Sequence, residues 1–387
     1  MKELEILLEN FWVIKEKNVD LYHEIKDASP KFKEFIEDKL GYRLLINPYL
    51  IKLEKLPGKC EAWMGIKEFD SQLEYGMFCL VLAFLEERGL SDQFVLSQVT
   101  EYLQSAWPGR EKLDWTLFRH RRSLVKVMRY SSDMFLLNVD DGDDSMFMDA
   151  SDAEVLYEST GLSRYFVRNF TANIMNCTNR KDIEEGEWLE TDRDRGRVRR
   201  NRVYRRLTMS PAVYNEGGDD ADYAYIKNFR NLLQKDFEGM LGAALHVHKN
   251  GAFLILESFS RYKDVFPANS TISDIVLQVN AEIVQRVNSG QLYRREDDII
   301  IVSRSEFESL IEKCRGKYLH GWSKEYREMS VDGLCNSVIS FMEDFSMIEA
   351  VSGGREIHIL PLCGKITGSY PESFGNIVKE SPEEKYK

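Results

Sequence analysis

The sequence holds few of the residues that build zinc clusters or disulfide scaffolds, and it has no long apolar run. Its six cysteines lie at least nineteen positions apart and form no C-x-x-C pair, which argues against both frameworks. The longest apolar run, residues 77–85, has nine residues, whereas a bilayer span needs roughly 20. The first residues lack the basic and then apolar plan of a secretory signal. We therefore expect a cytoplasmic protein without a membrane segment.

Recognisable enzyme motifs are missing as well. The nucleophile elbow, the phosphate-binding loop, the dinucleotide fingerprint and the HExxH zinc motif do not occur. His246 and His248 alternate on a predicted strand and share a face, which would suit two metal ligands. The neighbouring sequence offers no third candidate ligand. The sequence thus predicts a protein that is not an enzyme and that uses no cofactor or metal.

The chain is long and apolar enough for more than one core, since 43% of its 387 residues are hydrophobic. Its formal net charge is −12. A protein of this charge repels DNA at long range, so any contact with DNA must come from local clusters of cations.

The order of helix and strand signals predicts a mostly helical α+β fold. Three helices in the first half precede a hairpin, and helix, helix, helix, hairpin is the order of a winged helix. The second half repeats this plan after a hairpin that turns at Asn250-Gly251. The helices are expected at residues 71–88, 92–106, 114–130, 272–288, 303–318 and 331–345, and the hairpins at 42–56, 134–148, 243–257 and 347–360.

A constant spacing indicates that the two halves are a duplication. Leu40-Gly41 and Leu241-Gly242 are 201 residues apart, and so are Gly89 and Gly290. We therefore expect tandem winged-helix domains with β-hairpin wings, the alternative being two unrelated α+β domains. A third pair, residues 134–135 and 347–348, is 213 apart, which predicts an insertion of twelve residues in the second copy.

The same signals predict the domain boundaries. Residues 1–165 should hold N-terminal helices and the first winged-helix domain, 166–229 a connecting helix, a polar linker and an arginine-rich segment, 230–370 the second winged-helix domain, and 371–387 a flexible tail.

Two basic stripes are the candidate DNA contacts. Arg119, Arg122, Lys126 and Arg129 are spaced to share one face of the third predicted helix, which occupies the place of a recognition helix. The alternative is an ordinary solvated basic face.

The second stripe lies where eight of the fourteen residues from 193 to 206 are arginine. Arg195, Arg199, Arg202 and Arg206 would share one face of a helix, and guanidinium groups suit bidentate contacts with phosphate. The anionic partner could instead be an acidic protein surface, including residues 182–190 of this chain, or the segment could be a purely structural helix.

An acidic cluster at residues 140–144 lacks the alternating ligands and the terminal glutamate of a calcium loop, so it predicts a hairpin turn. Phosphates would be repelled by such a wing tip, which we therefore expect to face a protein.

Several segments resemble a known family. The stretches LDWT at 113–116 and HRRSLV at 120–125 are similar to the third-helix signature of the MukE-like subunit of Wadjet plasmid-defence systems. RRL at 205–207, SPAVY at 210–214 and DYAY at 222–225 resemble that family's arginine-rich helix and the acidic helix after it. The resemblance covers roughly residues 32–361, and the sequence departs from it in the arginine run 193–202 and the polar insertion before that run.

This resemblance implies a tandem winged-helix (KITE-type) accessory subunit of an SMC-like complex that extrudes plasmid DNA. Its partners would be a kleisin, the SMC-like ATPase, double-stranded DNA and, indirectly, a nuclease subunit. We expect a homodimer in that assembly. Two rival hypotheses remain, a tandem winged-helix transcriptional regulator and a metal-dependent nuclease built on residues 140–144 with Glu184 and Glu185.

Overall fold

The computed structural model describes residues 1–109, 111–150, 153–168, 174–179, 182–183, 195–218, 220–256 and 262–371. The chain forms two compact units, one of Met1–Lys59 with Trp188–Lys387 and one of Cys60–Glu187. About 52% of the chain is helical, and the described strands form small antiparallel three-stranded sheets. The mostly helical α+β class that the sequence predicts is therefore confirmed.

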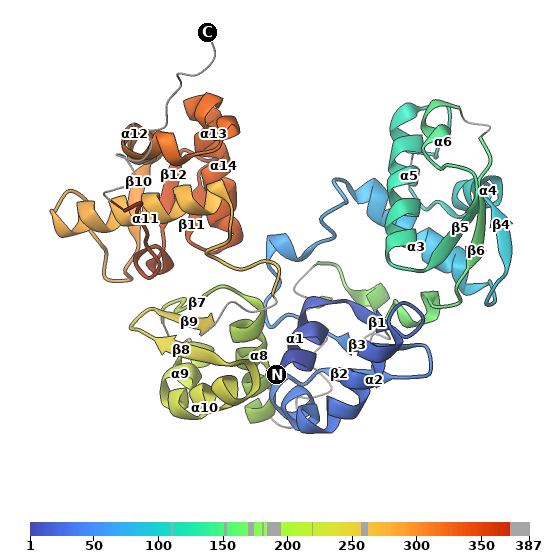
Figure 1. Ribbon diagram of the computed structural model, residues 1–387, viewed down its shortest axis with the longest axis horizontal. Coiled ribbons are helices and arrows are strands. Elements are labelled where there is room, and N and C mark those ends of the chain that lie inside the picture. Colours follow the sequence, from blue (N-terminus) through green and yellow to red (C-terminus); the bar gives the residue numbers. More distant parts are fainter. Residues whose placement is uncertain are drawn as a thin grey trace, which may run out of the picture. The chain divides into compact units, whose positions relative to one another are not determined.

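The first module, residues 2–54, opens the larger unit (Figure 1). It contains α1 (Lys2–Glu9), β1 (Trp12–Ile14), α2 (Val19–Ala28), η1 (Ser29–Lys31), the π-helix η2 (Phe35–Leu40), β2 (Arg43–Ile46) and β3 (Leu50–Glu54). Gly41 ends η2 in the left-handed region, at φ +62°. Asn47 accepts hydrogen bonds from the amides of Tyr49 and Leu50. These turn residues confirm the hairpin predicted at 42–56.

The second module, residues 72–159, lies in the smaller unit. It contains α3 (Gln72–Glu86), β4 (Gln93–Val95), α4 (Leu96–Ala106), α5 (Phe118–Asp133), β5 (Leu137–Asp141), α6 (Met146–Asp149) and β6 (Leu156–Ser159). Three short 3₁₀ helices flank the module in the same unit, namely η3 (Ala62–Met64), η4 (Ser163–Tyr165) and η5 (Ile174–Asn176). Phe94 of β4 and Val139 of β5 both pair with Tyr157, at the centre of the sheet.

One strand predicted in this module is wrong. The hairpin predicted at 134–148 places its second strand at the end of this range, but Met146–Asp149 form α6, and the return strand is β6. The helix forms because the Asp143 carboxylate accepts the Ser145 amide and because Phe147 is buried in the core. Arg121 then donates to the carbonyl of Met148 in the last turn of α6.

The third module, residues 195–256, returns to the larger unit. It contains α8 (Arg195–Met209), β7 (Val213–Tyr214), α9 (Ala221–Asn228), α10 (Arg230–Leu241), β8 (Ala243–Val247) and β9 (Gly251–Leu256). Asp220 caps α9 by accepting the amides of Asp222 and Tyr223. Gly242 ends α10 at φ +60°, in the same way that Gly41 ends η2. The hairpin predicted after Gly242 is confirmed.

The fourth module, residues 271–359, contains α11 (Thr271–Asn288), β10 (Ile300–Ser303), α12 (Arg304–Tyr318), η6 (Leu319–Gly321), α13 (Lys324–Glu328), α14 (Val331–Asp344), β11 (Ile348–Val351) and β12 (Glu356–Ile359), and η7 (Pro361–Gly364) follows it. Ser270, Ser303 and Ser330 cap α11, α12 and α14 with their hydroxyls. The predicted helices and terminal hairpin of this part are confirmed.

All four modules follow one plan of helix, strand, helix, helix and hairpin. In each sheet the first strand pairs with the last, giving the orders β1-β3-β2, β4-β6-β5, β7-β9-β8 and β10-β12-β11. The pairing of Phe94 with Tyr157 in the second module recurs as Val302 with Ile357 in the fourth. The hairpins of these two modules begin at Leu137 and Ile348, which are 211 residues apart, so the predicted pairing at 213 is misplaced by two residues.

The larger unit contains two cores. One is shared by the first and third modules and includes Leu4, Ile36, Tyr204 and Phe237, all fully buried. The other belongs to the fourth module and reaches Phe253 of β9. Residues 1–59 therefore pack with the second half of the chain. Among the described helices, none combines the length and the apolar content that crossing a membrane requires.

Candidate nucleic-acid interface

The helix α5 carries the first predicted stripe. Leu124 and Met128 are buried on one side of α5, as the helical period requires, and the cations lie on the other. The spacing of residues 117, 124 and 128 also predicts Leu117 on the apolar side, but this residue lies just before the helix and is 42% exposed. The module therefore presents a helix with a basic outer face.

Lys126 is held by two carboxylates. Its Nζ lies 2.6 Å from Asp70 Oδ2 and 3.0 Å from Glu74 Oε1. Glu74 is buried and also accepts the amides of Asp70 and Ser71 at the start of α3. The hydrogen bond to Asp70 raises the pKa of Lys126, and the same bond lowers the pKa of the Asp70 carboxyl. Lys126 thus ties α5 to the beginning of α3.

Two other members of the stripe are also paired. Arg129 Nε lies 3.0 Å from Asp144 Oδ1, so the acidic turn 140–144 neutralises the stripe at its C-terminal end. Arg119 lies 3.5 Å from Glu111, and both side chains are largely exposed. Such exposed pairs exchange readily for a phosphate because each contributes at most about 1 kcal/mol.

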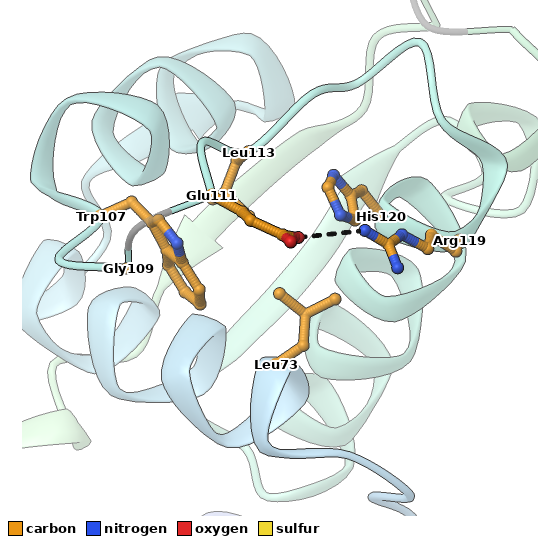
Figure 2. A pocket seen from close by; sticks show the side chains of 7 residues that line it. All are labelled: Leu73, Trp107, Gly109, Glu111, Leu113, Arg119 and His120. Carbon is orange, nitrogen blue, oxygen red and sulfur yellow. Dashed lines mark ion pairs between the residues drawn. The ribbon is translucent and has the colours of Figure 1, made fainter.

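The Arg119–Glu111 pair spans a pocket of about 340 Å³ (Figure 2). The Trp107 ring and Leu73 form its apolar walls, while His120 lies beside Arg119. His120 Nδ1 accepts the Asp114 amide, so this histidine holds the loop before α5. The described lining contains no serine, cysteine or second carboxylate, and the pocket therefore offers no nucleophile beside a base.

Arg122 is exposed like Arg119 and Arg129, but no acid among the described residues lies within ion-pair distance of it. Arg121, which is not among the predicted DNA contacts, has a structural role. Its guanidinium donates to the carbonyls of Trp115, Thr116 and Met148 and so joins α5 to α6. In the sequence, this role is indicated by the position of Arg121, which lies one residue before Arg122 and therefore on the side of the helix nearer the core.

The helix α8 carries the second stripe, and its arginines face acids of the same unit. Arg202 makes a bidentate pair with Asp222, with both N–O distances at 2.6 Å. Arg206 lies 3.5 Å from Asp222 and 3.4 Å from Glu216. The pairing with Asp222 raises the pKa of Arg202. These two arginines fit the structural-helix alternative, with α9 supplying the acid.

The remaining arginines of this segment divide into buried, exposed and undescribed ones. Arg205 is buried and donates to the carbonyls of Leu40 and Gly41, while Arg200 pairs with Asp38 at 2.6 Å. Arg199 is exposed, and the described residues place no acid beside it. The side chain of Arg195 lies outside the described residues.

The helix that corresponds to α5 in the fourth module has the opposite charge. The sequence of α5 contains five lysine and arginine residues, whereas that of α14, VDGLCNSVISFMED, contains none and has three acids. Both helices precede an antiparallel hairpin, although β5 has a register shift between Val139 and Asp141 that β11 lacks. A phosphate backbone would therefore be attracted to one of these two equivalent positions and repelled from the other.

The acids considered for a nuclease site have other partners. The Asp143 carboxylate accepts the Ser145 amide, and Asp144 pairs with Arg129. Glu184 and Glu185 lie outside the described residues. Within the described ranges, no three His, Cys, Asp or Glu side chains come close enough together to hold a metal ion.

His246 and His248, which share a face of β8, have a basic neighbour. Burial lowers the pKa of His246, and Lys365, whose Nζ lies 3.5 Å from His248 Nε2, lowers it further.

Comparisons with known proteins gave one family. Searches of curated proteins and of solved structures found no match. A family model described as "Protein of unknown function (DUF2398)" matches residues 4–369, which include all four modules except the first two residues of α1. The chain, with its cationic α5 and its four modules of one plan, therefore belongs to the DUF2398 family.

Proposed function

We propose that this protein is a non-catalytic accessory subunit of an SMC-like, DNA-extruding defence complex. In this role it binds a kleisin and the SMC-like ATPase assembly in the cytoplasm, contacts double-stranded DNA, and helps to restrict plasmids. The proposal joins the resemblance to the MukE-like Wadjet subunit with the arrangement of the four modules. ATP hydrolysis and DNA cleavage belong to other subunits of the complex.

The observation that carries the proposal is the repeated plan of the modules. Helix, strand, helix, helix and hairpin, with the first strand paired to the last, is the topology expected of a winged helix. We assign all four modules to this architecture. A chain of winged helices offers helices for DNA and sheet edges or hairpins for a partner peptide, and both contacts are needed by a subunit that links a kleisin to DNA.

The charge of α5 supports the DNA contact. This helix is the third of its module, in the place of a recognition helix, and Arg122 is exposed there without a described acidic partner. The phosphate contacts would be sequence-tolerant because they position a protein without reading bases. A complex that extrudes plasmids of any sequence requires this kind of contact.

Co-purification from the native genomic context tests the proposal. A tagged copy of the chain, expressed with its neighbouring genes, should recover a kleisin and an SMC-type ATPase, identified by mass spectrometry. The matched control is the same tag on a chain whose α5 cations Arg119, Arg122 and Arg129 are changed to Ala, which should keep the protein partners and lose DNA. Recovery of the chain alone on one promoter would contradict the proposal and favour the regulator.

The absence of catalysis is tested separately. The purified chain should neither hydrolyse ATP nor nick plasmid DNA, because no phosphate loop or paired-carboxylate site is legible in its sequence. Nicking that depends on a divalent metal and is abolished by Asp143→Ala would contradict this part of the proposal.

A further inference from the structure

The first and third modules correspond residue by residue at a spacing of 201. The Tyr22 hydroxyl donates to the carbonyl of Asn47 at 2.6 Å, and the Tyr223 hydroxyl donates to the carbonyl of His248 at 3.0 Å. Both the donors and the acceptors of these two bonds are 201 residues apart. Buried core residues repeat at the same spacing in five pairs, Tyr22/Tyr223, Ile25/Ile226, Phe32/Leu233, Ile36/Phe237 and Leu40/Leu241.

These corresponding residues meet in one core. Phe35 of η2 contacts the rings of Tyr204 and Phe237, with centroids 6.1 Å and 6.2 Å apart. The buried side of α8 packs on η2, and α1 contacts α10. The first helix of each module therefore packs on the third helix of the other module, so neither module closes its core alone.

The polar contacts across this core are reciprocal. Asn201, in the middle of α8, donates from Nδ2 to the carbonyl of Lys39, near the end of η2, at 2.8 Å. Met1, at the start of α1, donates from its amino group to the carbonyl of Met240, near the end of α10, at 2.6 Å. The two donors are 200 residues apart and the two acceptors 201. Each half of the chain thus donates a hydrogen bond to the other half at a corresponding position.

Reciprocal contacts of this kind are the signature of a two-fold, isologous interface. Stacked repeats behave differently, since each contacts its neighbour in sequence by translation. Here the first module pairs with the third. We propose that the chain is a single-chain equivalent of a two-fold dimer, in which residues 1–187 and 188–387 are the two subunits and the intact protein is a monomer. It takes the place of the homodimer that the family resemblance implies.

Because the two halves belong to one chain, their corresponding helices can differ in sequence and in charge. A homodimer would present two identical third helices, whereas this chain presents the cationic α5 and the acidic α14 at equivalent positions. If the proposed DNA contact holds, one chain therefore contacts DNA through α5 and not through α14. The pairing of the halves itself does not depend on DNA or kleisin binding.

Light scattering after size exclusion tests the proposal on the full chain. A recognition site for a specific protease is inserted between Glu187 and Trp188, where the chain passes from one unit to the other. The intact protein should have a mass of 45.1 kDa at every concentration. After cleavage the two fragments should elute together at that mass. A stable intact dimer, or fragments that separate, whether folded or aggregated, would overturn the proposal.

Substitutions in the cleaved protein test the contacts. Asn201→Ala with Arg205→Ala removes the hydrogen bonds that these side chains give to η2 and Gly41, and should lower the affinity of the fragments at least ten-fold. Arg199→Ala, on the exposed side of the same helix, is the control and should leave it unchanged. Should the double variant unfold before cleavage, Asn201→Ala alone should weaken the fragments in the same direction. Equal affinities throughout would assign the pairing to another surface.

The two proposals fail separately. A monomeric chain whose fragments stay together but which recovers no kleisin would contradict the proposed function and leave the pairing of the halves intact.

Discussion

At the scale of single residues, the arginines of α8 are defined by what they contact. Arg205 donates to the carbonyls of Leu40, the last residue of η2, and of Gly41, where the helix dipole favours a cation. Arg202, three residues earlier in the helix, pairs with Asp222. A sequence rich in arginine gave no sign of this division, because the acids that pair with Arg200 and Arg202 lie 162 and 20 residues away.

Gly41 and Gly242 provide a matched pair of substitutions. Both lie at positive φ, so alanine at either position costs about 1 kcal/mol of strain. A Cβ on Gly41 would lie 2.8 Å from the buried Asn201 side chain, whereas one on Gly242 would meet nothing within 4 Å. Gly41→Ala should therefore lower the free energy of unfolding by about 2–3 kcal/mol, and Gly242→Ala by about 1. Urea denaturation measures both, and equal losses would contradict this account.

Lys55 should make stability depend on pH. Its Nζ donates to the carbonyls of Leu7, Leu8 and Asn10, and burial lowers the pKa of Lys55 to about 8. The unfolded chain, with the ordinary pKa of 10.5, binds the proton more tightly. Burying Lys55 therefore costs no protonation energy above pH 10.5, where the amine is neutral in both states. As the pH falls through 8, the folded protein must also take up the proton, and this part of the free energy of unfolding is lost.

Between pH 7.5 and 9.5 the free energy of unfolding should rise by about 1–2 kcal/mol in the wild type relative to Lys55→Met. Urea denaturation of both proteins across this window measures the difference. The comparison removes the contributions of other groups, which are common to both proteins. Parallel curves would show that Lys55 keeps its ordinary pKa.

At the scale of elements, the sequence predicted the long helices and the hairpins because turn residues and caps mark their ends. It missed β1, β4 and β7, which have two or three residues and no strand signal of their own. These strands form because the hairpin of each module leaves one edge unpaired. Their registers with β3, β6 and β9 come from the tertiary fold, which a local pattern does not contain.

The stripe on α5 could also be predicted only in part. Helical spacing places Arg119, Arg122, Lys126 and Arg129 together, but not the carboxylates that face three of them. Glu74 and Asp70 come from the start of α3, and Asp144 from the turn after β5. The sequence shows these acids without showing which helix they approach.

DNA binding through α5 should have a modest salt dependence. Because Lys126 is held by two acids, we expect Arg122, with Arg119 or Arg129, to make the phosphate contacts, which gives a log–log salt slope of about −1 to −2. Changing Arg119, Arg122 and Arg129 together to Ala should bring the slope near zero and weaken binding to all sequences alike. Arg199→Ala on α8 is the control. Fluorescence anisotropy at several salt concentrations measures the slopes, and an effect of Arg199→Ala alone would move the contact to α8.

At the scale of the whole molecule, the division into units separates the effects of core substitutions. Phe147→Ala removes a buried ring from the smaller unit, and Phe237→Ala removes one from the core of the first and third modules. Each should cost about 3–5 kcal/mol. Amide hydrogen exchange should speed up within residues 60–187 for Phe147→Ala. For Phe237→Ala it should speed up in residues 1–54 as well as 195–256, and protection unchanged in residues 1–54 would contradict a shared core.

The core that unites the first and third modules also affects how the protein responds to its own abundance. Two separate chains joined by such a surface would come apart on dilution, since their association follows mass action. Halves within one polypeptide have an effective concentration set by the connecting chain. A cell holding only a few copies of this protein would therefore still contain every copy in its paired form, with the basic α5 and the acidic α14 always matched one to one.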